Sequence, residues 1–186
     1  MFLQNYYNYL NGVALYDAAN DKIAESTVVD FTGTERNVGY APHYYGALTS
    51  FGVDRINSGT GTYTTSVEAD DTEEPYIIFG DGTVEPALND YNLSGNRIIL
   101  TNLSNTLVRE VKDNEVVHNR LFTIQNNTSE SVTISEFGLI FPMGWHKIGY
   151  NYYCMFYRAL LPEPITIEAG NTGTIKISIP VPLVSP

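Results

Sequence analysis

The sequence predicts a mainly β protein, an antiparallel β-sandwich or jelly roll preceded by an irregular N-terminal region rich in tyrosine and glycine. Two observations lead to this prediction. Apolar and polar residues alternate with a period of two along much of residues 121–181, which indicates strands with one buried and one solvated face. Clusters of turn-forming residues separate these runs, as they do in antiparallel strands joined by short loops.

The period-two runs identify the residues expected to face the core. In the final strand, Thr174 to Ile179, the alternation predicts a buried face made of isoleucines. Turns are expected where Asn, Gly and Pro cluster, because these residues adopt the dihedral angles that chain reversals require. The apolar residues of the runs are Phe122, Ile124, Val132, Ile134, Ile165, Ile167, Ile175, Ile177 and Ile179, and the turns are expected at 126–130, 162–164 and 169–173.

One strand changes phase. Apolar residues fall on even positions at Val132 and Ile134 but on odd positions from Phe137 onward. Such a one-residue slip is typical of a β-bulge, and Glu136 and Gly138 lie where it occurs. The alternative is that both faces of this strand are buried, in which case the phase carries no information.

Further strands are expected upstream, at 27–31, 97–100 and 107–111, with Asp113-Asn114 joining the last of these to the strand that ends at Phe122. Counting from residue 76, the chain offers seven or eight strands at fairly even spacing. That number is enough to close a two-sheet sandwich or jelly roll. We therefore expect a β-sandwich domain at 76–186 and an N-terminal arm with a loop-rich region and a few strands at 1–75; the alternative is that 1–75 belongs to the same domain.

The N-terminal region is rich in aromatic residues. Aromatic side chains that lie on a protein surface favour association with a partner. The first ten residues are expected to form an arm that docks onto a neighbouring subunit, with packing on the chain's own core as the alternative. Tyrosines in the Gly-rich stretch 32–65 either face a partner or cover the edge of the sandwich. The residues assigned to an assembly interface are Phe2, Leu3, Tyr6, Tyr7, Tyr9, Tyr44 and Tyr45.

Composition excludes several classes of function. The formal net charge of −11 disfavours nucleic acid and anionic membranes as partners. A single cysteine, Cys154, rules out an internal disulfide framework. No signal-peptide pattern and no apolar run of membrane-spanning length is present, so neither secretion by a leader nor a spanning helix is expected.

The chain offers no motif that predicts catalysis, a cofactor or a metal. His43, His118 and His146 occur without metal-ligand spacing, and a Cys154–His146 dyad is disfavoured because the cysteine lies among apolar and aromatic residues. Glu136 and Arg158 are charges in otherwise apolar strands. They are expected either to pair with each other or to point to the solvated face.

Two polar segments resemble ligand sites only weakly. The acidic run of Glu68, Asp70, Asp71, Glu73 and Glu74 lacks the spacing of a defined calcium loop, so a solvated loop is expected. The segment 80–83 (G-D-G-T) is interpreted as a turn, because a phosphate site would need a helix to follow it and residues 86–93 have the character of a loop.

Several short motifs resemble a known family. The orders F-T-I-x-N-N-T, S-V-T-I-S-E-F-G-L and R-A-L-L-P-E-P-I-T-I-x-A-G-x-T-x-T-I-x-I-x-I, with the upstream segment I-F-G-D-G-T-V-E-P-A, are similar to the C-terminal β-domain of tailed-bacteriophage structural proteins. The resemblance covers about residues 76–181. It implies a non-enzymatic virion component of a tail, neck or head attachment, assembled in the host cytoplasm with other virion proteins and as a symmetric homo-oligomer.

Two other functions are alternatives to this one. A glycan- or receptor-binding module of a virion tip or head fibre would use exposed aromatic side chains, for which Tyr44, Tyr45, Trp145 and Tyr150 are the candidates. A glycan hydrolase would need a pair of carboxylates, and nothing in the sequence selects such a pair.

Overall fold

The computed structural model describes residues 1–8, 25–30, 32–39, 68–69, 76–112, 115–145 and 150–182. Strands make up 62% of the structure and helix 5%, which confirms the prediction of a mainly β fold. The helix is one short segment at residues 4–8. All strand pairs given for the described residues are antiparallel, so the expected antiparallel character is confirmed as well.

Ten strands are described, and they differ greatly in length. The longest form two hairpins in the second half of the chain, where the period-two pattern of the sequence is strongest. The strands are β1 (Glu25–Val29), β2 (Glu35–Gly39), β3 (Glu68–Ala69), β4 (Tyr76–Gly80), β5 (Arg97–Ile98), β6 (Thr101–Lys112), β7 (Glu115–Gln125), β8 (Val132–Trp145), β9 (Tyr150–Ile167) and β10 (Thr172–Pro182).

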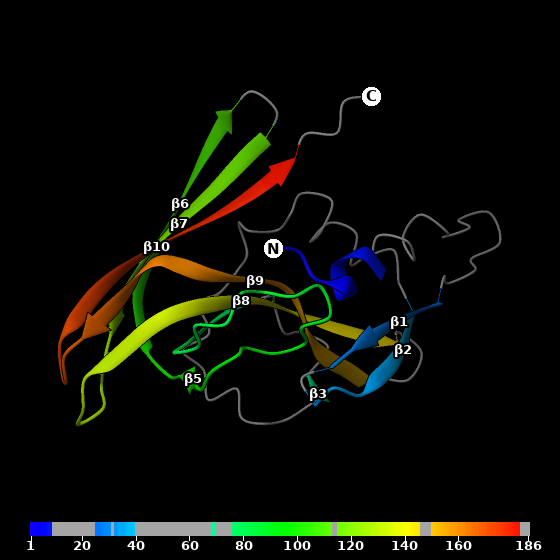
Figure 1. Ribbon diagram of the computed structural model, residues 1–186, viewed down its shortest axis with the longest axis horizontal. Coiled ribbons are helices and arrows are strands. Elements are labelled where there is room, and N and C mark those ends of the chain that lie inside the picture. The colour runs from blue at the N-terminus through cyan, green and yellow to red at the C-terminus, as the bar shows by residue number, and fades with distance from the viewer. Residues whose placement is uncertain are drawn as a thin grey trace.

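The described strands form three sheets. A five-stranded sheet has the order β3-β9-β8-β4-β5, a three-stranded sheet has the order β10-β7-β6, and β1 and β2 form a hairpin of their own. In Figure 1 the three-stranded sheet extends away from one end of the long β8–β9 hairpin, while β1, β2 and β3 lie toward the other end.

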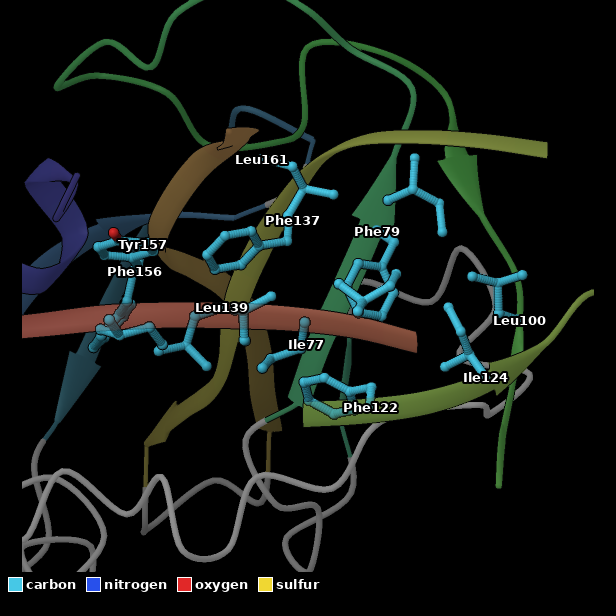
Figure 2. Packing of buried hydrophobic residues seen from close by; sticks show 14 of the residues in the cluster. Ile77, Phe79, Leu100, Phe122, Ile124, Phe137, Leu139, Phe156, Tyr157 and Leu161 are labelled. Atoms are coloured by element: carbon cyan, nitrogen blue, oxygen red, sulfur yellow. The ribbon is translucent and has the colours of Figure 1, made fainter. Parts of the chain in front are cut away.

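One hydrophobic core includes residues of both larger sheets. Ile175, Ile177 and Ile179 of β10 are at most 1% exposed, as the alternation predicted. The ring of Phe79 in β4 meets that of Phe122 in β7 edge to face, with centroids 5.8 Å apart. Figure 2 shows this packing, in which side chains from β4, β7, β8 and β9 converge. A sandwich or jelly roll remains our interpretation of how the two sheets are arranged.

The ladder between β8 and β9 is irregular where the phase changes, but the extra residues lie in β9, so the bulge expected in β8 is wrong. Ile134 pairs with Ile165 and Glu136 pairs with Leu160, so Ser135 alone stands across from residues 161–164 of β9. Residues 134–141 of β8 are all buried, which confirms the alternative, that both faces of this strand are buried.

The turn predicted at 162–164 is wrong, because β9 continues through this Pro-Glu-Pro segment. The segment lies in the interruption of the β8–β9 ladder. Proline has no N–H to donate and is therefore tolerated where a ladder is broken. The turn at 169–173 is present: Asn171 N–H donates to Glu168 O over 3.0 Å, and Gly170 has a φ of 73°.

Two other strand predictions need adjustment. The strand expected at 107–111 is longer and spans all of β6, and the segment expected at 97–100 contains only the short β5. Lys112 pairs with Glu115, so β6 and β7 form the expected hairpin around residues 113–114. Glu68, expected in a loop, begins the two-residue strand β3. The predictions for 9–24, 40–67 and 70–75 fall outside the described residues.

Candidate functional site

The segment between β4 and β5, residues 81–96, is a long loop without helix or strand. We call it the 81–96 loop. In Figure 1 it is the green coil that crosses in front of β8 and β9, and hydrogen bonds to Glu136 of β8 and Arg158 of β9 show that it contacts both strands. A loop of this length with a defined path inside a compact structure is usually functional.

Beneath the loop lies a buried ion pair. Arg158 donates from Nε to Glu136 Oε2 over 2.7 Å, and the two side chains are 2% and 0% exposed. The register places Gly138, not Glu136, directly opposite Arg158, so the pair is diagonal across the two strands. Of the two alternatives for these charges, pairing with each other is confirmed.

The rest of the Arg158 guanidinium binds the loop. Its Nη1 donates to the carboxylate of Asp90, and its Nη2 donates to the carbonyl oxygen of Val84 over 2.6 Å. The three donor nitrogens of one side chain thus reach β8 and two separate points of the loop. The planar fork of arginine suits this task, because its donors point in fixed directions.

Glu136 binds the far end of the same loop. Its Oε1 accepts from Gly95 N over 2.8 Å, and its Oε2 accepts from both N and Oγ of Ser94 at 3.2 Å. With Arg158 these donors compensate the buried carboxylate, as a charge removed from water requires. The loop approaches closely because Gly82 has no side chain: a Cβ there would lie 2.1 Å from Glu136 Oε1.

The two ends of the loop are tied to each other. Asn96 donates from its backbone N to Asp81 Oδ1 over 2.6 Å and from Nδ2 to Asp81 Oδ2 over 3.1 Å. These hydrogen bonds hold the pKa of the Asp81 carboxyl below its ordinary value. Asp90 also accepts from Ala87 N over 2.8 Å, which closes a turn inside the loop.

The loop exposes apolar side chains on this anchored backbone. Val84, Leu88 and Tyr91 are 65%, 44% and 42% exposed. Val84 is held at its carbonyl by Arg158, and Leu88 is held at its carbonyl by Gln4 N over 2.8 Å. The Tyr91 ring lies over Gly33, in the turn between β1 and β2. The backbone is therefore fixed at several points while the three side chains face solvent.

The predicted interface residues at the N-terminus pack mainly on the chain itself. Leu3 is fully buried, its N donates to Phe156 O over 2.9 Å, and Phe2 forms a β-bridge with Tyr157. Tyr6 stacks on Phe2 with centroids 4.3 Å apart. Phe2, Leu3 and Tyr6 therefore follow the alternative expectation and pack on the chain's own core. They do so because the backbone of β9 at residues 156–157 pairs with the N-terminal segment.

The other members of the predicted interface are placed differently. Tyr7 is 46% exposed and keeps surface for a partner. Tyr9, Tyr44 and Tyr45 lie outside the described residues, as do the side chains of Trp145 and Tyr150. Of these aromatic side chains, the described structure therefore places only that of Tyr7.

The sequence did not identify Asp90, Ser94 or Gly95 as partners of the two buried charges. The sequence did contain a signal. A buried carboxylate and a buried guanidinium that pair with each other still need further hydrogen-bond partners. The sequence alone indicates only a turn at G-D-G-T and a loop around Asp90. Ser94 and Gly95 lie more than 40 residues from Glu136 in the sequence, so no local pattern connects them with this carboxylate.

The single cysteine of the chain is buried among apolar and aromatic residues of β9. Burial raises the pKa of the Cys154 thiol, which therefore stays protonated and unreactive. Within the described ranges no group of three or more His, Cys, Asp or Glu residues is placed to hold a metal ion. The side chains of the acidic run 68–74 lie outside the description.

Comparisons with protein families, curated proteins and solved structures found no match to this chain. In the segments that the structure describes, no helix has the length and apolar character needed to cross a membrane.

Proposed function

We propose that this protein is a non-enzymatic structural component that acts by protein–protein assembly, of the kind found in the tail, neck or collar of a tailed-phage virion. The observation that carries the proposal is the 81–96 loop, which holds Val84, Leu88 and Tyr91 in solvent on a backbone anchored by buried charges. Exposed apolar side chains on a fixed frame are typical of a docking surface.

The anchoring favours binding for an entropic reason. A loop that becomes ordered only on binding loses conformational entropy in that step, which weakens the complex. Here the order is already supplied by Arg158, Glu136 and the Asp81–Asn96 pair. The hydrophobic contribution of each apolar side chain that a partner covers, about 1.5–3 kcal/mol for full burial, is then largely retained.

Two sequence features support the virion setting. The motifs of residues 76–181 resemble the β-domains of phage structural proteins, whose partners are other virion proteins. The net charge of −11 disfavours direct contact with nucleic acid. The Glu136–Arg158 pair, which lies in these motifs, supports a structural role because both side chains are buried and bonded to the loop.

Light scattering over a range of concentrations tests the proposal, with a glycan screen on the same preparation. We expect association of the parent, reduced in a variant with Val84→Ser, Leu88→Ser and Tyr91→Ser. Substitutions on another exposed surface, Thr174→Ala and Ser178→Ala of β10, serve as the control. A monomer that binds a glycan would instead support the receptor-binding alternative.

A further inference from the structure

In the part of the chain that the structure describes, the three-stranded sheet has one long open edge. Within the described residues β6 pairs only with β7, so one side of this 12-residue strand has no strand beside it. The opposite edge, β10, carries Pro180 and Pro182, which cannot donate to a further strand. The edges of the five-stranded sheet, β3 and β5, are only two residues long.

Proteins protect a sheet edge from pairing with another chain by short strands, prolines, charged side chains and β-bulges. β6 is long and has no proline, its register shift lies at Asn102/Ser104 and its charges lie at 109–112, so residues 104–108 carry none of these features. In Figure 1 it lies at the outer side of its sheet, with β7 and then β10 beside it. A strand in this position presents a row of backbone N–H and C=O groups that a further strand satisfies.

The middle of this edge also exposes apolar surface. Val108 is 51% exposed, and Leu121 of β7 is 45% exposed. Leu121 pairs with Thr106, two residues from Val108, so Val108 and Leu121 are diagonal neighbours on the outer face of the sheet. An apolar stripe therefore reaches the edge at Val108.

We propose that the edge of β6 pairs with β6 of a second copy of this chain, antiparallel and about a two-fold axis through Val108. The two three-stranded sheets then join into one six-stranded sheet. A two-fold contact uses the same surface on both copies, as most soluble homodimers do. The inference rests on the proposed assembly role and names one partner for it. The surface involved is the edge of β6 and not the 81–96 loop.

The charges of β6 favour a second copy of the chain as the partner, and they favour the register centred on Val108. Although the chain carries −11, the edge strand itself carries Arg109, Glu110 and Lys112, so two copies approach along it without a net negative barrier. With the axis at Val108, Glu110 faces Thr106 and Lys112 faces Ser104. If the axis passed through Arg109 or Glu110 instead, that residue would lie opposite the same residue of the second copy. Like charges in directly opposite positions are unfavourable.

The same register places the two Val108 side chains beside each other. The apolar stripe then runs without a break from Leu121 of one copy to Leu121 of the other. Opposite residues in an antiparallel pair have Cα atoms about 4.5–5.5 Å apart, which is within the range that a disulfide spans. The arrangement is thus open to a direct covalent test.

Cysteine cross-linking tests this pairing on the full chain. The native Cys154 is fully buried and adds no background. Under a copper–phenanthroline oxidant, Val108→Cys is expected to form a covalent dimer about tenfold or more faster than Leu121→Cys. Leu121 is the matched control, because it is similarly exposed but lies one strand away from the edge.

The register is tested by mixing two further variants. Thr106→Cys and Glu110→Cys face each other across the axis, so their mixture is expected to cross-link while each alone does not. Equal rates for Val108→Cys and Leu121→Cys, or cross-linking of each variant alone as fast as the mixture, would overturn the proposal. If the parent associates by light scattering but Val108→Cys forms no cross-link, the β6 pairing is rejected and the assembly role is retained. If the parent stays monomeric, both proposals are rejected.

Discussion

Arg158 of β9 and Glu136 of β8 form a buried ion pair, with 2.7 Å between Nε and Oε2, and their remaining hydrogen bonds go to the 81–96 loop. Burying two charges is expensive, and such a pair is seldom the most stable choice for a core. Its value here is positional: one arginine and one glutamate fix both halves of a loop that has no secondary structure of its own.

Removing the arginine is expected to destabilise the protein strongly. Arg158→Met leaves Glu136 buried without its cation and releases Asp90 and Val84 from β9. The free energy of unfolding is expected to fall by about 3–5 kcal/mol. Urea denaturation followed by tryptophan fluorescence and circular dichroism measures the change.

The matched control is the double variant Glu136→Gln with Arg158→Met. Glutamine carries no charge and still accepts hydrogen bonds from Ser94 and Gly95, so about 1–3 kcal/mol should be regained relative to Arg158→Met alone. A loss below 1 kcal/mol in the single variant, or no recovery in the double, contradicts the ion-pair interpretation.

Gly82 is expected to be intolerant of any side chain. Its Cβ would lie 2.0 Å from Ser94 Oγ and 2.5 Å from Gly95 N, so Gly82→Ala must push the loop off Glu136. Overpacking of this kind costs about 1–3 kcal/mol. Gly138→Ala is the comparison, because its Cβ would meet the mobile end of Met155 at 2.6 Å. Thermal unfolding should rank Gly82→Ala as the more damaging, and the reverse order would count against the packing described.

Asp30 is expected to contribute stability that depends on pH. Burial alone would raise the pKa of its carboxyl, but hydrogen bonds from Thr32, Arg36 and Thr34 outweigh it and hold the pKa below the ordinary value of 3.8. A carboxyl with a lowered folded pKa contributes fully above the unfolded pKa, and the contribution is lost as the pH falls through the folded value.

Asp30→Asn is therefore expected to be about 1–3 kcal/mol less stable than the parent at pH 7. The difference should shrink as the pH falls below 3.8 and through the lower pKa of the folded Asp30 carboxyl. Denaturant titrations from pH 7 to pH 2.5 measure it. A difference that stays constant over this range would show that the charge of Asp30 is not what stabilises the β1–β2 turn.

The last strand is expected to be essential to the core. Ile177 is 1% exposed, so Ile177→Asp buries an unpaired charge and should cost several kcal/mol, on the order of the whole stability of a domain. Lys176→Asp places the same side chain on the exposed face one residue earlier and should change stability by about 0.5 kcal/mol or less. Similar melting temperatures for the two variants would contradict the assignment of faces in β10.

The sequence was most informative where one face of a strand is buried. Alternation placed Ile175, Ile177 and Ile179 on the buried face of β10. This signal is local, because period-two burial depends only on residues within one strand. The phase change near Glu136 came from a strand buried on both faces, and the extra residues of the ladder lie in β9. The Pro162–Pro164 error was local as well: the prolines interrupt a ladder there without ending the strand.

The site was harder to predict because it is made by long-range contacts. The charges of Glu136 and Arg158 were visible in apolar strands, but nothing local connects them with Asp90, Ser94 and Gly95. The placement of the N-terminal arm was open for a related reason. Its aromatic residues suit either a neighbour or the chain itself, and the choice depends on the edge that β9 leaves open to Phe2.

The central claim is that the buried charges present the 81–96 loop as a docking surface. Sedimentation velocity of Glu136→Gln tests it most directly, at a temperature where circular dichroism shows the variant folded. The substitution changes no exposed side chain, but it weakens the bonds to Ser94, Gly95 and Arg158. The account predicts self-association or partner binding at least about tenfold weaker than the parent, since one or two charged hydrogen bonds are weakened. Association equal to that of the parent would contradict it.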